Sequence, residues 1–295
     1  MRGAEAGVPR LPAADAVPLA AQDGRARRPH ARPSHVSTGR VSSNEELLAL
    51  QRALYESRNP TRRWLHCTRR DWIAGRLTRL AADGRRAALE VGPGSGVYVP
   101  LLARLFERVT VTDVHHAYLD AARVLAADHP NVAVVQDDIR QPALPAASFD
   151  VVLCTEVIEH VVESRAALAG MRRLLRAGGV LVLSTPQRYS PLEVCSRIAL
   201  LPGVIDVVRR IYREPILPTD HVNLMTAAEA RRQLREAGFE IRESHKSGLY
   251  VPVLAEAGGE WGRRLAAWLE RRLSQGPLDR LLWTQYYVAV AGARD

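Results

Sequence analysis

Apolar residues along most of the chain follow two alternating spacings. Short apolar runs, such as residues 87–91 and 149–155, have the length of buried strands. Between them, segments such as residues 117–127 place apolar side chains three or four positions apart, which is typical of an amphipathic helix. Further strands are predicted at 108–114, 132–136, 180–184, 239–246 and 282–290, and further helices at 61–81, 97–106, 165–175, 226–238 and 261–273. The alternation predicts an α/β fold with a doubly wound, mostly parallel sheet of seven strands.

Local signals set some of the expected boundaries. Thr226 and Glu229 have the spacing of a capping box that opens a helix, and Gly238 is expected to end it. Gly178 and Gly179 are expected to stop the helix at 165–175 before the next strand begins.

The spacing also divides the chain into three parts. Residues 1–42 hold five prolines and no regular apolar spacing, so we expect a disordered basic tail there. Residues 43–84 are expected to form N-terminal helices, the first opening at Ser43, and residues 85–295 the sheet domain. Within that domain the regular pattern is interrupted at about 187–222 and 249–280, which predicts two helical cap insertions.

Composition narrows the classes of function. The formal charge of +9 would suit a nucleic-acid partner, but 40 of the 41 basic residues are arginine and no nucleic-acid-binding motif is present. Three widely spaced cysteines suggest neither a disulfide framework nor a zinc site, and no apolar run is long enough to cross a bilayer. We therefore expect a cytoplasmic protein without a nucleic-acid partner.

A glycine-rich turn follows the first predicted strand. The segment Glu90-Val-Gly-Pro-Gly-Ser-Gly96 is bounded by a strand and a helix, an arrangement that lets backbone approach a nucleotide-like ligand. Such turns bind several cofactors, and some are only tight turns. A dinucleotide-binding motif would have a third glycine where this chain has Val97.

Acidic and polar residues end the next predicted strands. Asp113 ends the second, where a carboxylate can accept hydrogen bonds from ribose hydroxyls. Asp137 and Asp138 follow the third strand, and residues 154–160 follow the fourth. All of these positions fall at the carboxyl edge of the sheet, where open α/β folds bind ligands.

Taken in order, these motifs resemble the class I S-adenosylmethionine-dependent methyltransferases, especially the group that includes ubiquinone-biosynthesis O-methyltransferases. The resemblance extends over about residues 89–239, with Pro93 where the family usually has a small residue or cysteine. It implies a Rossmann-like fold, S-adenosylmethionine as cofactor, and N-terminal helices that cover the donor site. It also implies cofactor-binding roles for Glu90, Gly92, Gly94, Gly96, Tyr98, Asp113, Asp138, Ile139 and Thr155.

Methyl transfer from a sulfonium needs mainly close, collinear positioning, and a base helps when the acceptor is a hydroxyl or an activated carbon. The candidate bases are His160, His221, Glu156 and Glu159, of which each histidine has a solvated or packing role as its alternative. Other side chains in the N-terminal helices could contact the donor, namely Trp64, His66, Arg69 and Arg70. Core packing is the preferred role of Trp72, and no metal site is expected.

The acceptor is expected to be a small hydrophobic or aromatic metabolite. Apolar stretches at 198–201, 204–208 and 249–254 lie outside the predicted sheet and would line a substrate pocket or a dimer contact. Oxygen is the favoured acceptor atom, with carbon and nitrogen left open, as are a homo-oligomer and a peripheral membrane contact. The alternatives are a nicotinamide-dependent oxidoreductase and a non-catalytic S-adenosylmethionine-binding protein.

Overall fold

Seven strands form a single sheet in the computed structural model, which describes residue 51 and residues 53–199 and 221–292. The expected basic tail at 1–42, the helix opening at Ser43 and the central part of the first cap insertion lie outside the described residues. All described residues belong to one unit, Val41–Asp295.

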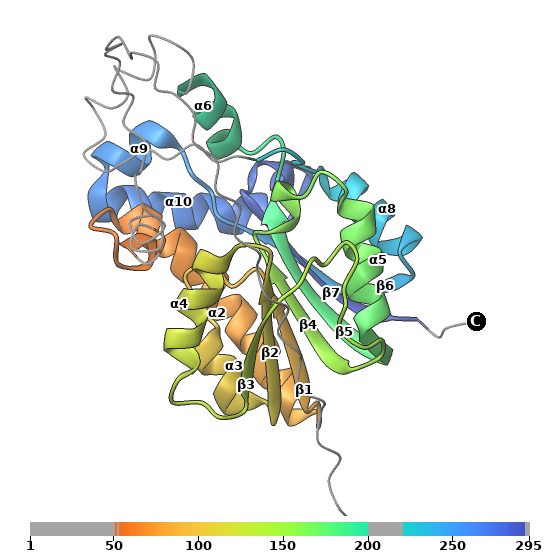
Figure 1. Cartoon of the computed structure of the whole chain (residues 1–295). Helices are drawn as coiled ribbons and strands as arrows, with labels where there is room; N and C mark the ends of the chain where they lie inside the picture. Colours follow the sequence, from red (N-terminus) through yellow and green to blue (C-terminus); the bar gives the residue numbers. More distant parts are fainter. Residues whose placement is uncertain (1–50, 52, 200–220, 293–295) are drawn as a thin grey trace, which may run out of the picture. The chain divides into compact units, whose positions relative to one another are not determined.

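The sheet order is β3-β2-β1-β4-β5-β7-β6 (Figure 1). The strands are β1 (Ala87–Val91), β2 (Arg108–Asp113), β3 (Val132–Gln136), β4 (Phe149–Thr155), β5 (Leu175–Pro186), β6 (Phe239–Ser247) and β7 (Thr284–Ala291). The first five are parallel, and β7 runs antiparallel to both β5 and β6. This arrangement confirms the predicted Rossmann-like, mostly parallel sheet.

Helices cover both faces of the sheet (Figure 1). They are α2 (Pro60–Ala82), α3 (Val99–Leu105), α4 (His116–Ala126), α5 (Ser164–Leu174), α6 (Pro191–Ala199), α8 (Ala227–Glu236), α9 (Pro252–Ala257) and α10 (Gly259–Leu273), with short 3₁₀ turns η1 (Leu54–Glu56), η2 (Ile158–His160) and η3 (Pro277–Leu281). Helices α2, α3 and α4 pack on one face, and α5 and α8 on the other.

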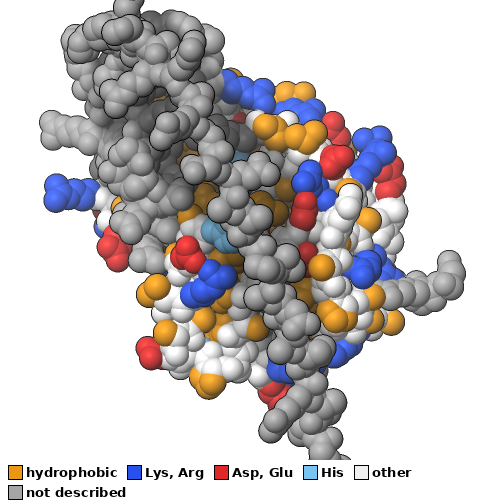
Figure 2. Space-filling model, viewed as in Figure 1, with side chains coloured by type: hydrophobic (Ala, Val, Ile, Leu, Met, Phe, Trp, Pro, Cys, Tyr) orange, Lys and Arg blue, Asp and Glu red, His pale blue; other side chains and the backbone are white. Residues whose placement is uncertain are grey.

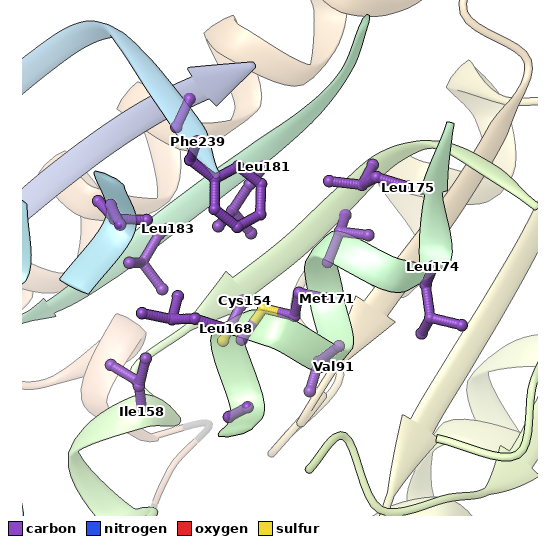
Figure 3. Packing of buried hydrophobic residues seen from close by; sticks show 14 of the residues in the cluster. Val91, Cys154, Ile158, Leu168, Met171, Leu174, Leu175, Leu181, Leu183 and Phe239 are labelled. Atoms are coloured by element: carbon purple, nitrogen blue, oxygen red, sulfur yellow. The ribbon is translucent and has the colours of Figure 1, made fainter. Parts of the chain in front are cut away.

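The buried core explains why β1 and β4 are so apolar. Because a parallel strand in the middle of such a sheet is covered on both faces, every residue of β1 is buried. Figure 3 shows the core on one face of the sheet, in which Leu168 and Met171 of α5 pack against Cys154 of β4. The free thiol of Cys154 is therefore an apolar core group, and burial raises its pKa.

Capping residues fix the starts of two helices, of which only the second cap was predicted from the sequence. Asn59 precedes α2, and its side chain accepts hydrogen bonds from the backbone N–H groups of Thr61 and Arg62. Thr226 and Glu229 form the predicted reciprocal capping box of α8. Gly238, at φ +81°, then turns the chain into β6.

Several predicted boundaries differ from the structure, and two of the differences have a clear physical reason. Gly178 and Gly179 do not stop α5, because that helix already ends at Leu174 and β5 begins at Leu175. The glycines instead lie in an irregular stretch of β5, where the pairing with β4 shifts register and Gly178 has φ +72°. Helix α3 begins at Val99 rather than Val97, because the turn at Gly96 delays it and the Val99 N–H bonds to the Gly96 carbonyl at 3.1 Å.

Helices outside the sheet occupy both predicted insertions. The first contains α6, and the second contains α9, α10 and η3. Helix α10 packs against α9 and α2. Leu249 and Tyr250 of the second predicted insertion are buried, and Tyr250 packs against Leu65 and Trp283.

Candidate functional site

The candidate site lies where β1 and β4 are neighbours and the order of the strands reverses. Ligands of open α/β sheets bind at this position, beyond the carboxyl ends of the strands. The glycine loop after β1, Asp113 after β2, Asp138 after β3 and Thr155 at the end of β4 all meet this edge. The structure thus brings the sequence-predicted donor residues to one edge of the sheet.

All three glycines of the loop adopt a conformation that other residues rarely take. Gly92, Gly94 and Gly96 have φ of +68°, +52° and +75°. A Cβ at Gly92 would clash with Val157, and one at Gly96 with Leu125. The conformation of the loop therefore requires glycine at these positions. Because glycine has no side chain, a ligand can approach the backbone of the loop closely.

Two unsatisfied polar side chains lie beneath the loop. The Glu90 carboxyl is buried on β1, and neither oxygen has a hydrogen-bond partner among the described residues. Burial raises its pKa to about 8. The Tyr98 hydroxyl is likewise buried without a described partner, and burial raises its pKa well above the usual range. Unpartnered buried groups cost free energy, so both are suited to accept a ligand's polar atoms.

The acidic residues at the ends of β2 and β3 differ in their hydrogen-bond and ion-pair partners. Asp113 is half-buried, accepts the His115 N–H at 2.8 Å, and has its pKa raised by burial. Asp137 accepts backbone N–H groups of its own loop, including that of Ala143 at 2.9 Å. Asp138 instead pairs with Arg140 on the surface, which lowers the pKa of Asp138. Since both oxygens of Asp137 already accept hydrogen bonds from the loop backbone, we still predict that Asp138 contacts the ligand.

The remaining predicted donor contacts lie beside these acids. Ile139 is buried directly after Asp138, and Thr155 is half-buried at the last position of β4. Ile139 belongs to the core that packs under α5, so its contact with the donor stays a prediction, as does that of Thr155.

Glu156 is engaged by other side chains rather than free. Its Oε2 accepts a hydrogen bond from Arg69 of α2 at 2.7 Å, and its Oε1 accepts one from Ser184 of β5 at 2.9 Å. Glu156 also has φ +53°, a strained value for a non-glycine residue. Arg69 further contacts His66 Nδ1 at 3.2 Å, and burial, followed by the charge of Arg69, lowers the pKa of His66. Glu156 therefore links α2 to the sheet, which weakens its candidacy as a base.

The two candidate histidines lie together although 61 residues separate them. The ring centroids of His160 and His221 are 5.1 Å apart. Glu159 lies beside them, fully buried, with Oε2 accepting a hydrogen bond from Thr185 at 2.9 Å and Oε1 without a described partner. Burial and then the charge of Glu156 raise the pKa of Glu159 well above its usual range.

This trio also has donor atoms that suit a metal ion, which the sequence did not predict. One ligand atom from each of Glu159, His160 and His221 lies within 4.8 Å of the others. Two imidazoles and a carboxylate are a common donor set for divalent transition metals, and the unpartnered Glu159 Oε1 is a vacant buried acceptor. The residues present therefore fit such an ion.

A further residue, Glu193, was missed by the sequence reasoning. Its carboxylate is buried in α6, where Oε2 lies 3.1 Å from His221 Nδ1 and Oε1 accepts the Trp283 indole N–H at 3.0 Å. The spacing Ser190-x-x-Glu193 looks like a helix capping box, and Ser190 does accept the Glu193 N–H at 3.3 Å. No signal in the sequence indicated that this side chain would orient a histidine 28 residues away.

Other aromatic and basic candidates serve the packing of α2. Trp72 stacks on His245 with 5.7 Å between centroids, as its preferred packing role predicted. Trp64 lies against the small core around Trp283. Arg70 pairs with Asp71 on the surface.

The fold and the order of these residues define a Rossmann-like methyltransferase. A family model described as a methyltransferase domain matches residues 89–183. A probable S-adenosylmethionine-dependent methyltransferase of Mycolicibacterium smegmatis is 31% identical over 201 residues, which cover 67% of this chain and 68% of the relative. A ubiquinone biosynthesis O-methyltransferase of Xanthomonas axonopodis pv. citri is 31% identical over 197 residues, covering 64% and 74%.

The chain therefore belongs to the S-adenosylmethionine-dependent methyltransferases, and S-adenosylmethionine is its cofactor. This membership does not support the nicotinamide oxidoreductase alternative. Solved structures agree on the fold: a magnesium protoporphyrin IX methyltransferase from Synechocystis has a TM-score of 0.56 at 17% identity, covering 84% of this chain and 96% of the other. A putative sarcosine dimethylglycine methyltransferase from Galdieria sulphuraria gives 0.54 at 14% identity, covering 78% and 88%.

Among the described residues, no helix has the length and apolar character required to cross a membrane.

Proposed function

We propose that this methyltransferase transfers the methyl group to a hydroxyl oxygen of a small apolar or aromatic metabolite. The observation that carries the proposal is the group of Glu159, His160 and His221 beyond the carboxyl end of β4. An amine acceptor that arrives neutral needs no base, whereas a hydroxyl becomes a good nucleophile only as its proton leaves. A site equipped with two imidazoles therefore favours oxygen.

The donor would occupy the edge formed by the glycine loop, Asp113 and Asp138, as the family resemblance implies. Asp113 would accept the ribose hydroxyls, and the backbone of the loop would lie against the methionine part. The positive sulfonium needs no activation, so the protein's task is to hold the acceptor oxygen close to the methyl carbon and in line with the sulfur.

His221 is the histidine best prepared to take a proton. Its Nδ1 faces the Glu193 carboxylate, and an N–H at Nδ1 donating to that carboxylate leaves Nε2 as the free lone pair. The exposed His160 ring lies beside it and can pass the proton to solvent. A divalent cation held by the trio would occupy the Nε2 lone pair of His221, so it would replace the base and would itself lower the pKa of a bound hydroxyl.

Exposed apolar side chains close in sequence to His221 and Glu193 support an apolar acceptor. Val222, next to His221, is 62% exposed, and Tyr189 and Val194, in the segment that carries Glu193, are 60% and 41% exposed. Such exposed apolar groups suit contact with an apolar substrate. The ubiquinone biosynthesis O-methyltransferases among the relatives point in the same direction for the acceptor atom.

The test is methyl transfer from labelled S-adenosylmethionine to a panel of catechols, phenols, aliphatic alcohols and amines. We expect turnover with an apolar phenol or alcohol, and a loss of roughly a hundred-fold in kcat for His221→Ala with donor binding unchanged. His129→Ala is the matched control, because it removes a histidine that precedes β3, at the opposite edge of the sheet. Turnover of amines alone, or donor binding without any turnover, would contradict the proposal.

A further inference from the structure

Helix α10 exposes two tryptophans, which is unusual for the largest apolar side chain. Trp261 is 67% exposed and Trp268 is 47% exposed, while the other three tryptophans of the chain are buried or half-buried. A tryptophan that stays exposed loses the large favourable free energy of burying its ring. Two such residues on one helix therefore indicate a surface that a partner covers.

The two tryptophans lie on the same face of the helix. They are seven residues apart, which is two turns and about 10 Å along the axis. The opposite face, with Gly262 and Ala266, is buried in the protein. The tryptophans therefore point outward together.

Arginines surround them. Arg264, Arg271 and Arg272 are exposed on the same side of α10, and the Arg272 guanidinium lies 5.5 Å from the Trp268 ring centroid. Among the described residues, neither Arg271 nor Arg272 forms an ion pair, whereas Arg264 shares Glu260 with Arg263. We call Trp261, Arg264, Trp268, Arg271 and Arg272 the α10 face.

Elsewhere on the protein, basic side chains are mixed with acidic ones. On the face drawn in Figure 2, basic and acidic side chains lie side by side over the described residues. Many arginines elsewhere have acidic partners, such as Arg76 with Glu243 and Arg176 with Asp150. The α10 face instead combines a net positive charge with aromatic side chains.

Charge argues against two occupants from this chain itself. Residues 1–42 carry seven arginines and three acidic residues, so that segment would bring positive charge to a positive face. A second copy using the same face would place its arginines against these arginines. The occupant must be anionic and must also accept indole rings.

We propose that the α10 face binds an anionic lipid surface. Tryptophan inserts its ring at the boundary between headgroups and acyl chains, and arginine pairs with lipid phosphates. A single convex helix offers no groove that could follow a nucleic-acid backbone, which favours lipid over a single strand. The net charge of +9 adds a long-range attraction to such a surface. This inference is independent of the acceptor and of the acceptor atom.

The test uses the full chain with phosphatidylcholine vesicles made with and without phosphatidylglycerol, in a flotation assay. We expect binding only to the anionic vesicles, weakened by salt. Trp261→Ala with Trp268→Ala should lower binding at least roughly ten-fold, since two indoles lose their apolar contact. Neutralising the three arginines as Arg264→Gln, Arg271→Gln and Arg272→Gln should lower it roughly a hundred-fold.

The matched control removes three exposed arginines elsewhere, as Arg104→Gln, Arg123→Gln and Arg232→Gln, and should keep most of the binding. Calorimetric binding of S-adenosylhomocysteine verifies that every variant is folded. Quenching of tryptophan fluorescence by brominated lipid should be lost in the double tryptophan variant. The proposal is overturned if the wild type does not bind anionic vesicles or if the α10 and control variants bind them equally. It is also overturned if the α10 changes abolish binding to single-stranded RNA but not to vesicles.

Discussion

Arg69 of α2, which is buried, and Glu156 beyond β4, which is half-buried, form an ion pair with 2.7 Å between Nη1 and Oε2. Ser184 completes the coordination of the same carboxylate from β5. The three groups join the helix that precedes the sheet to two of its central strands, at the edge where the donor residues gather. The pair thus ties the position of α2 to the geometry of the candidate site.

Breaking this pair should destabilise the protein strongly. Arg69→Met leaves the half-buried Glu156 carboxylate without its cation, which costs at most about 3 kcal/mol in the free energy of unfolding. Arg70→Met, one position on, removes only a surface pair with Asp71 and should cost less than about 0.5 kcal/mol. Urea denaturation followed by circular dichroism measures both. Similar small losses in the two variants would show that the pair does not hold α2 in place.

Asp113→Ala should weaken the donor site without unfolding the protein. The lost hydrogen bonds from a charged acceptor correspond to roughly a hundred-fold in the dissociation constant of S-adenosylmethionine. Asp120→Ala, on the exposed side of α4, is the control and should bind as the wild type does. Calorimetric titration with S-adenosylmethionine and S-adenosylhomocysteine gives the constants, and unchanged binding by Asp113→Ala would remove this residue from the donor site.

The sequence predicted the sheet well because its strands are locally distinctive. β1 and β4 begin and end where their apolar runs do, since a central strand covered on both faces is mostly apolar. The glycine boundary in β5 was wrong because Gly178-Gly179 suits a helix end and a strand irregularity equally. Only the pairing with β4 decides between them.

The site was predictable in part for a related reason. Gly92, Gly94 and Gly96 lie in the loop after β1 and Asp113 is the last residue of β2, so their place at the sheet edge follows from topology. The partners of the histidines do not, because Glu193 reaches His221 through tertiary packing of α6, and Glu159 is set beside them by the turn η2. Local sequence carries no information about such contacts.

Glu193→Gln should lower kcat while leaving donor affinity unchanged. The amide can offer its NH₂ group to His221 Nδ1, which favours the tautomer with its proton on Nε2 and removes the lone pair needed there. We expect a roughly ten- to hundred-fold decrease in kcat with little change in KM for the acceptor. Glu229→Gln, a carboxylate engaged with Arg188 and Thr226, is the control. An equal effect in both variants would reduce Glu193 to a structural role.

A divalent cation should bind the trio of Glu159, His160 and His221. Binding to the folded state alone at about a hundred times the dissociation constant adds about 2.7 kcal/mol, which raises Tm by several degrees. Thermal melting with and without Mn²⁺ or Zn²⁺ measures this shift. His160→Ala should abolish it and the exposed His116→Ala should not. A shift that persists in His160→Ala would place the ion elsewhere.

Binding of the donor should release a proton from Glu90. Because burial raises the pKa of this carboxyl to about 8, most molecules hold it neutral at pH 7. S-adenosylmethionine carries an ammonium and a sulfonium, and a positive charge near Glu90 favours its ionised form. By linkage, the observed binding enthalpy at pH 7 should vary with the ionisation enthalpy of the buffer, with a slope close to one proton.

Glu90→Gln should abolish that slope, whereas Asp113→Asn should keep most of it.

The Glu90→Gln variant also tests the raised pKa of Glu90 through the pH dependence of stability. The raised pKa means that the wild type loses stability as pH rises from the unfolded value of about 4.5 to about 8, while glutamine does not titrate. The free energy of unfolding of Glu90→Gln should therefore increase relative to the wild type across that window. A difference that stays constant with pH would mean that Glu90 is ionised in the free protein and has no proton to release.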